Sequence, residues 1–371
     1  MIIFVSNCGF TFDKTIAPML RYFDPTEATY LVGNYGWRGK LPLPGPTDGF
    51  LSTLFKWPLA AFKAYQFLKN NTGTKICVNN RNASFPFRLV KRLGLAPADV
   101  ELIYFARGLY FHGGQTPIIN KFVRFLEIIL SKSDDKIICQ SMEDFQFLLR
   151  NSIPIEKLYY VGNGVKGVNF EDTVSSSRNY DVAYVGRISK EKAIDSALEG
   201  IILAAKQIQR KFSVVLVGGC LDSFSEDWFK STLERLRKEN DFDEWIDLKI
   251  TGMVPRIEVF RILRDTKILL HCSLREGVPR ALLEAIFQGV TPVAAFVRGN
   301  AEVMQQFGFK DFCYELHGNK SESSMIAEFL VKALIDRTGK TRVQSELKLQ
   351  KTLYSFYGYD AYITRIKNCL A

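Results

Sequence analysis

Two carboxylates flank the start of a predicted helix in the segment Ser273–Glu284. Glu276 stands in the loop and Glu284 in the helix, and Gly277 and Val278 between them offer main-chain amides. The first turn of a helix binds anions because its N–H groups lack partners within the helix. A carboxylate repels phosphate but accepts hydrogen bonds from hydroxyl groups. This combination predicts a ligand that carries both a diphosphate and sugar hydroxyls.

Strand and helix signals surround this segment. The apolar run Ile268–His271 predicts the strand before it, Pro279 suits the first position of the helix, and Gly289 suits its end. Taken alone, Glu284 also fits a surface helix residue, and Glu276 fits a favourable charge near a helix start. The choice between these interpretations depends on a second segment.

That second segment is Asp181–Lys192, a predicted strand followed by a glycine turn and several cations. Gly186 makes the turn, Arg187 and Lys192 follow it, and Lys190 is interpreted as a solvated charge. Ligands of open α/β sheets bind at the carboxyl ends of the strands. A planar guanidinium and a compact ammonium at that edge are suited to a diphosphate.

Both halves of the chain alternate short apolar runs with longer helical segments, the pattern of parallel βαβ units. The 371 residues exceed what one core usually organises, so we expect two Rossmann-like, doubly wound α/β domains facing across a cleft. The polar stretch Gly162–Asn179 predicts the boundary. The domains are then 1–165 and 166–350, with a C-terminal helix over 351–371 packed back on the first. The expected strands are Met1–Ser6, Ala28–Val32, Lys75–Asn79, Glu101–Phe105 and Lys136–Gln140 in the first half, and Leu158–Val161, Asp181–Gly186, Ser213–Gly218, Leu248–Thr251, Ile268–His271 and Thr291–Ala295 in the second.

Charge and composition narrow the choice of partners. Of the net charge of +10, residues 1–165 hold +7, with 19 Lys and Arg against 12 Asp and Glu. A basic domain favours a phosphorylated acceptor or an acidic membrane surface over nucleic acid. The seven cysteines are scattered and the three histidines lie far apart, so no metal is expected. With no signal peptide and no spanning run, we expect a cytoplasmic location, with peripheral membrane contact as an option.

Three further motifs have simple structural interpretations. Gly162–Gly167 fits G-x-G-x-x-G, but no room for a helix follows it, so we expect a turn rather than an NAD site. Asp241–Asp243 has the D-x-D form of some metal-binding transferases, yet its polar surroundings predict a loop. Lys56–Lys69 interleaves lysines with aromatic residues at helical spacing. It is typical of a helix on its own sheet, although such a stripe can also lie on anionic lipid.

The two charged segments together resemble the retaining glycosyltransferases of family four, the glycosyl transferases group 1. The E-x7-E signature of that family matches Glu276 and Glu284, and its G-R-x-x-x-x-K pattern matches Gly186, Arg187 and Lys192. The resemblance covers residues 134–305. It implies a GT-B fold and a transfer that retains the anomeric configuration without a metal or other cofactor.

The resemblance also implies a division of labour at the donor site. Arg187, Lys192 and the helix start would stabilise the charge that develops on the leaving diphosphate. Glu276 would orient the sugar and Glu284 would hold the ribose. The donor is expected to be a UDP- or GDP-linked hexose and the acceptor a saccharide or glycolipid. Further donor-binding candidates are Gly186, Gly218, Met253, Val254, Gly277, Val278 and Pro279.

The first domain is expected to bind the acceptor. Similar proteins carry a glycine-rich loop after the first strand, and often a histidine near the reacting sugar. His112 is the nearest match to that histidine, and it suits an ordinary loop or packing position equally well. Loop polarity also explains Asn80 and Arg81. The acceptor candidates are Gly9, Phe10, Asn80, Arg81 and Arg107.

Three alternative functions use the same residues. A sugar-nucleotide epimerase or hydrolase would keep the fold and change the reaction. A catalytically silent protein would only bind the sugar nucleotide, but it would not need both glutamates and both cations. A retaining glycosidase would require Glu276 and Glu284 to flank one glycosidic bond, for which the sequence gives no indication.

Overall fold

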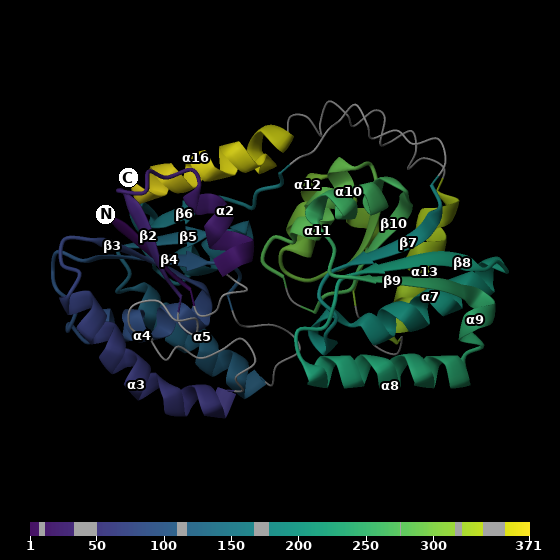
Figure 1. The fold of residues 1–371 in the computed structure, drawn as a ribbon, viewed down its shortest axis with the longest axis horizontal. Coiled ribbons are helices and arrows are strands. Elements are labelled where there is room, and N and C mark those ends of the chain that lie inside the picture. The colour runs from purple at the N-terminus through teal and green to yellow at the C-terminus, as the bar shows by residue number, and fades with distance from the viewer. Residues whose placement is uncertain are drawn as a thin grey trace. The chain divides into compact units, whose positions relative to one another are not determined.

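The structure is a computed structural model. It describes residues 1–6, 12–32, 50–109, 117–166, 178–274, 276–315, 321–336 and 353–371. Contacts divide the chain into two compact units: Met1–Gly164 with Tyr359–Ala371, and Val165–Gly358 (Figure 1). Each unit is built on a six-stranded sheet in which the paired strands are parallel. The predicted fold class of two doubly wound α/β domains is therefore confirmed.

The first sheet contains β1 (Ile2–Ser6), β2 (Ala28–Val32), β3 (Lys75–Asn79), β4 (Glu101–Ala106), β5 (Lys136–Cys139) and β6 (Leu158–Tyr160). Their spatial order is β2-β1-β3-β4-β5-β6, so the direction of winding reverses between β1 and β3. The placement of Leu158–Val161 in the second half was wrong. Leu158 pairs with Ile137 of β5, because α6 (Met142–Arg150) lies between β5 and β6 and returns the chain to the first sheet.

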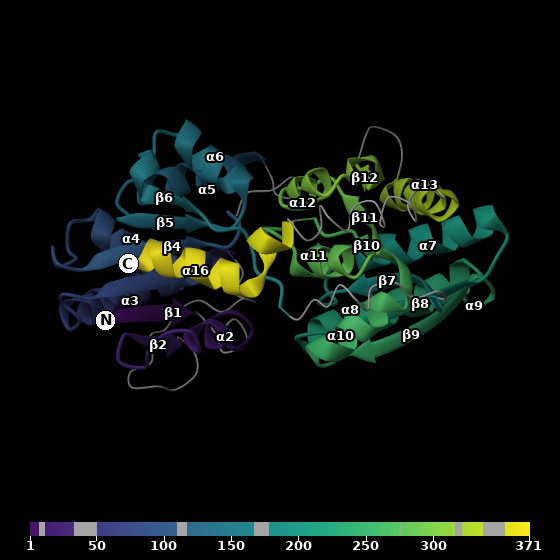
Figure 2. The same cartoon turned by 90° about the horizontal axis from the view of Figure 1, so that it is seen from above.

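Helices cover both faces of the first sheet. The core of one face includes residues of α3 (Phe50–Lys69), α4 (Asn80–Arg92) and α6 (Met142–Arg150), and α5 (Pro117–Ser131) packs beside α4. The other face is covered by α2 (Ala17–Leu20), which follows η1 (Phe12–Ile16), and by α16 (Tyr359–Leu370). In Figure 2, α16 lies across the near face of this sheet. The short η2 (Ile155–Lys157) precedes β6.

Two sets of hydrogen bonds fix α16 in the first unit. Arg365 donates from two guanidinium nitrogens to the carbonyl of Val161, at 3.0 and 2.9 Å. At the other end of the helix, Lys75 donates to the carbonyl of Leu370 at 2.6 Å and Lys136 to that of Cys369 at 3.0 Å. The last helix of the chain is thus part of the unit that begins the chain.

The second sheet contains β7 (Tyr180–Val185), β8 (Phe212–Val217), β9 (Ile246–Gly252), β10 (Thr266–His271), β11 (Thr291–Ala295) and β12 (Cys313–Tyr314). Their order is β12-β11-β10-β7-β8-β9, so winding reverses between β7 and β10. The two residues of β12 were not predicted, because so short a run has no recognisable period.

Helices also lie on both faces of the second sheet (Figure 1). On one side are α7 (Ile194–Ile208), α8 (Ser223–Glu239) and α13 (Glu322–Ile335), and on the other are α10 (Arg256–Arg264), α11 (Arg280–Phe287) and α12 (Asn300–Gln306). The shorter helices are η3 (Lys190–Lys192), α9 (Phe242–Trp245) and η4 (Lys310–Phe312). The loop expected over Asp241–Asp243 was wrong, because Asp241 precedes the single helical turn of α9 and Asp243 lies within it.

Candidate active site

The two charged segments follow neighbouring strands on either side of the reversal in the second sheet. Gly186 and Arg187 follow β7, and Ser273 and Glu276 follow β10. Parallel neighbours end at the same edge of a sheet, and this reversal is where α/β sheets bind ligands. The two loops also contact each other, since the N–H of Leu274 donates to the carbonyl of Glu191 at 3.0 Å.

Lys192 is at the centre of a charged cluster. Its ammonium group forms an ion pair with the Glu276 carboxylate and donates a hydrogen bond of 3.2 Å to the Ser273 hydroxyl. His271 Nε2 lies 3.1 Å from the same carboxylate oxygen of Glu276. The side chains of Lys192 and Glu276 are 17% and 15% exposed, and His271 is buried. Four polar groups therefore converge where the apolar strand ends.

This cluster keeps Glu276 ionised. Burial by itself raises the pKa of a carboxyl group, but the charge of Lys192 and the hydrogen bond to His271 outweigh it, and the pKa of Glu276 lies well below its usual range. An ionised carboxylate only accepts hydrogen bonds. Glu276 is therefore suited to holding hydroxyl groups rather than to donating a proton.

Arg187 has a weaker partner of its own. Its guanidinium lies 3.1 Å from the Glu191 carboxylate four residues later, and its side chain is 37% exposed. Such an exposed pair contributes little, so Arg187 can exchange this partner for a ligand. Lys190 is exposed as expected, but its ammonium also lies 5.3 Å from the centre of the Phe224 ring. Lys190 therefore points to α8 rather than to the Lys192 cluster.

Glu284 is buried in α11, so its interpretation as a surface residue was wrong. Only 7% of the residue is exposed, and its carboxylate lies 2.6 Å from the guanidinium of Arg256 at the start of α10. Burial raises the pKa of Glu284, while the charges of Arg256 and Arg280 oppose that rise. A buried carboxylate needs such a partner. Arg256 was not predicted from the sequence; its signal is a cation two residues after Val254, a predicted base-binding residue.

Two glycines allow the strand-end loops to approach each other. Gly218 has φ +142°, and a Cβ atom there would lie 1.8 Å from the carbonyl oxygen of Gly186. Gly299 has φ +80°, and its Cβ would lie 1.5 Å from the carbonyl oxygen of Gly277. Any larger residue would displace the loops. Gly218 was a predicted donor residue, whereas Gly299, the last residue before α12, was missed.

The other predicted donor residues differ in what they can offer. Met253 is 67% exposed, and Val254 is half-buried beside the small core that includes Ile262. Val278 and Pro279 are buried, so only their main chains can face a ligand. Pro279 is the residue before α11 rather than its first residue, because its ψ of 117° is extended.

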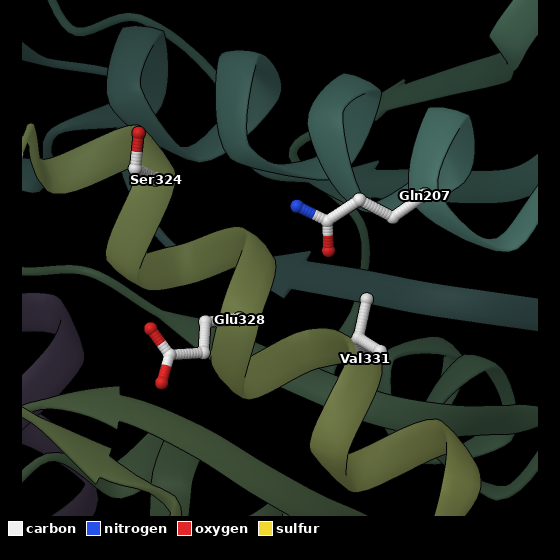
Figure 3. Close-up of a pocket in the computed structure, with 4 residues that line it drawn as sticks. All are labelled: Gln207, Ser324, Glu328 and Val331. Carbon is white, nitrogen blue, oxygen red and sulfur yellow. The ribbon is translucent and has the colours of Figure 1, made fainter.

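The described residues of the second unit line at least two hollows. One, of about 290 Å³, opens at the carboxyl ends of β10, β11 and β12. Leu274, which belongs to the loop that carries Ser273 and Glu276, is one of its lining residues. The other, of about 440 Å³, lies between α7 and α13 (Figure 3). Its lining includes one charged residue, Glu328, and it belongs to the helix layer. The residues around the first hollow are Leu274, Ala295, Phe296, Val297, Tyr314, Glu315 and Glu322.

Acceptor candidates in the first unit follow β1, β3 and β4, which are neighbours in its sheet. Arg107 follows β4, donates to the Asn79 side-chain oxygen at 3.2 Å, and lies over the Phe105 ring at 4.3 Å. The loop expected at Asn80 and Arg81 was wrong, because α4 begins directly after β3. Gly9, Phe10 and His112 lie outside the described residues, as do the side chains of Asn80 and Arg81.

Neither a metal centre nor a membrane span is found in the part of the chain that the structure describes. Within those residues, no three His, Cys, Asp or Glu side chains are placed to hold a metal ion. No helix among them is long and apolar enough to cross a bilayer.

The chain is similar to a known protein family and to several solved structures. A family model described as glycosyl transferases group 1 matches residues 166–342. No curated protein sequence matches the chain significantly. Among solved structures, Anabaena Alr3699/HepE in complex with UDP and glucose is similar over 100% of this chain and 98% of that chain, with a TM-score of 0.70 and 16% identity.

Two further structures show the same architecture. The N-terminal domain of Candida albicans trehalose-6-phosphate phosphatase matches 100% of this chain and 96% of its own, with a TM-score of 0.68 and 14% identity. The pneumococcal O-GlcNAc transferase GtfA in complex with UDP and GlcNAc matches 85% of this chain and 60% of its own, with a TM-score of 0.59 and 14% identity. At these identities the similarity is one of fold.

Proposed function

Because a family model described as glycosyl transferases group 1 matches residues 166–342 and the chain has the GT-B fold, we propose that the protein is a retaining, metal-independent glycosyltransferase. It moves a hexose-type sugar from a nucleoside-diphosphate sugar to a saccharide or glycolipid acceptor. The observation that carries this proposal is the cluster of Lys192, Glu276 and His271 at the reversal of the second sheet.

The diphosphate is proposed to bind beside Lys192 and Arg187. Lys192 is held by Glu276 but stays partly exposed, and Arg187 has only an exposed partner, so both cations can turn to phosphate oxygens. The main-chain amides at the start of α11 add donors. When the bond between the anomeric carbon and the phosphate oxygen breaks, negative charge grows on the leaving diphosphate. Cations already in place stabilise that charge without rearrangement.

The sugar and the ribose are proposed to bind the two glutamates. Glu276 stays ionised and accepts hydrogen bonds from sugar hydroxyls, with its orientation fixed by Lys192 and His271. Glu284 accepts from the ribose, and Arg256 holds its carboxylate in place. The exposed side chain of Met253 and the neighbouring Val254 would then flank the base. The UDP named for the HepE and GtfA structures favours uridine as that base.

The acceptor is proposed to bind the first unit at the carboxyl ends of the neighbouring strands β1, β3 and β4. Among the described residues, the candidate there is Arg107, which is half-buried and donates a hydrogen bond to Asn79. Its positive charge suits a phosphorylated or acidic acceptor. The excess of basic residues in 1–165 supports an anionic acceptor, a lipid-linked saccharide among them. A cytoplasmic protein in peripheral contact with an anionic membrane fits this choice.

A nucleotide panel followed by product analysis tests the proposal. Ligand binding to the native state raises its stability, so UDP or GDP should raise the unfolding temperature by a few degrees at saturation, and ADP should not. Incubation of the stabilising sugar nucleotide without acceptor should release little free sugar, unlike a hydrolase, and should leave the sugar nucleotide itself unchanged, unlike an epimerase. If no nucleotide stabilises the protein, the proposed function is wrong.

A further inference from the structure

Helix α5 has two apolar faces. The inner one is ordinary, with Val123 and Leu130 buried against the first unit. The outer one exposes Ile118 at 81%, Phe122 at 45% and Phe125 at 59%. The spacings of four and three residues place these side chains in one stripe along the helix. Single exposed apolar residues are normal, but three large ones in a row on one helix indicate an interaction surface.

The charges beside this stripe are all basic. Lys121 and Arg124 are exposed on α5, and Lys132 is exposed directly after its last residue. The single acidic residue between Pro117 and Ser131 is Glu127, which is 5% exposed and points inward to Arg88 at 2.8 Å. Among its own residues, α5 therefore presents apolar and cationic side chains together on its outer face, and its single carboxylate lies on the inner face.

Helix α3 has the same character. Leu59 and Phe62 are 54% and 53% exposed, and Lys63 and Lys69 are exposed beside them. The sequence of α3 contains no acidic residue. Both α3 and α5 pack on α4, and the two helices lie on the same side of the first sheet (Figure 1). The exposed stripes of α3 and α5 therefore lie on the same layer of helices.

We propose that the outer face of α5, continued by that of α3, docks on an anionic lipid bilayer. Apolar side chains would enter the boundary between headgroups and acyl chains, while the long cationic side chains reach the lipid phosphates. We call this surface the apolar-basic face. It consists of Leu59, Phe62, Lys63, Lys69, Ile118, Lys121, Phe122, Arg124, Phe125 and Lys132.

Charge argues against a second copy of the chain as the occupant. A two-fold dimer places the same patch of both subunits together. Such a dimer would set Lys121 and Arg124 against their own equivalents, and like charges in contact are unfavourable. An anionic bilayer supplies both an apolar interior and negative charge at its surface. The inference concerns attachment of the protein and needs no donor, acceptor or catalysis.

Flotation with lipid vesicles tests the inference on the full chain. We expect binding to vesicles of phosphatidylcholine with about one-third phosphatidylglycerol, weaker binding at high salt, and little binding to phosphatidylcholine alone. Phe125→Ser should weaken binding about tenfold, because it removes one inserted aromatic side chain. Lys121→Glu with Arg124→Glu should weaken it at least about 25-fold, at roughly fivefold for each charge removed.

Matched controls lie elsewhere on the same unit. Ile155 is 62% exposed in η2 and Arg150 is exposed at the end of α6, so Ile155→Ser and Arg150→Glu make the same chemical changes off the apolar-basic face. Both should bind vesicles like the unchanged protein. All variants alter exposed side chains, and circular dichroism would verify that they fold.

Two results would overturn the inference. One is an unchanged protein that ignores anionic vesicles; the other is equal loss of binding in the control and test variants. Dimerisation that Phe125→Ser abolishes, without vesicle binding, would assign the face to a second copy instead. Because the assay contains no sugar nucleotide, its failure leaves the proposed transferase function standing, and failure of nucleotide binding leaves this inference standing.

Discussion

Each unit contains a cation that pairs with carboxylates: Arg88 pairs with two in the first unit, and Lys192 pairs with one in the second. In the first unit, Arg88 lies 2.8 Å from both Glu127 and Asp134, and all three side chains are 0–5% exposed within the helix layer. In the second unit, Lys192 and Glu276 meet at the strand ends, and their side chains are 17% and 15% exposed. The difference teaches that position decides the role. A sealed network joins helices, whereas an open one at a sheet reversal can receive a ligand.

The sealed network leaves no capacity for a ligand. Arg88 also donates 2.9 Å hydrogen bonds to Asp134 and to the Ser131 hydroxyl, so it links α4, the end of α5 and the loop before β5. Burial raises the pKa of Asp134 to about 7, although the charge of Arg88 opposes the rise. A carboxylate so expensive to bury depends on its cation.

The largest effect is expected from Arg88→Ala. It strands two buried carboxylates, so the free energy of unfolding should fall by about 3–5 kcal/mol. Urea denaturation measures the loss, with the exposed Arg150→Ala as the control. Transfer by the fraction that stays folded should be unchanged. A stable Arg88→Ala protein with impaired transfer would reverse the comparison between the two networks.

The opposite pattern is expected for Lys192→Ala. Loss of one preorganised cation at the leaving group should lower the transfer rate about 10²–10³-fold. The free energy of unfolding should fall less than in Arg88→Ala, because Glu276 is partly exposed and keeps His271 as a partner. Lys190→Ala, two residues away and directed toward Phe224, is the matched control and should transfer normally. A near-normal rate in Lys192→Ala would remove Lys192 from the site.

A smaller effect is expected from the ribose side of the site. Glu284→Gln should raise KM for the donor about tenfold with little change in kcat, because a contact made equally before and during reaction contributes uniform binding. Arg256→Ala should act in the same direction through Glu284, and Arg256→Lys should recover part of the loss. Exposed Glu258→Gln on α10 serves as control. An equal fall in kcat would place Glu284 nearer the reacting atoms.

The smallest effect concerns acid. The pKa of Glu276 is lowered in the folded protein, so its ionic contribution to stability is present above the unfolded value of about 4.3 and is lost as pH falls below it. Chemical denaturation between pH 7 and pH 3 should show the unchanged protein losing on the order of 1–2 kcal/mol relative to Glu276→Gln. A difference independent of pH would mean that Lys192 and His271 do not hold the carboxylate ionised.

The strands and the donor loops could be predicted from the sequence, whereas the pairing of strands and the contacts between distant residues could not. Continuous apolar runs locate most strands, but sheet membership depends on pairing, and so Leu158 was assigned to the wrong half. Spacing along the chain identifies Glu276 and Lys192, which remain predictions as site residues. Arg256 and His271 were missed, because their roles depend on neighbours that are distant in sequence or on the exact direction of a strand end.

The placement of α16 has a consequence for synthesis of the protein. Tyr362, Ile363 and Ile366 are buried against the face of the first sheet that includes Phe4. The strands of the first sheet emerge from the ribosome first, yet the part of this apolar face that α16 covers stays open until residues 359–371 have been made. The second unit, which lies between them in the chain, has all its residues earlier. Of the two units, the one that contains β1 is therefore completed after the other.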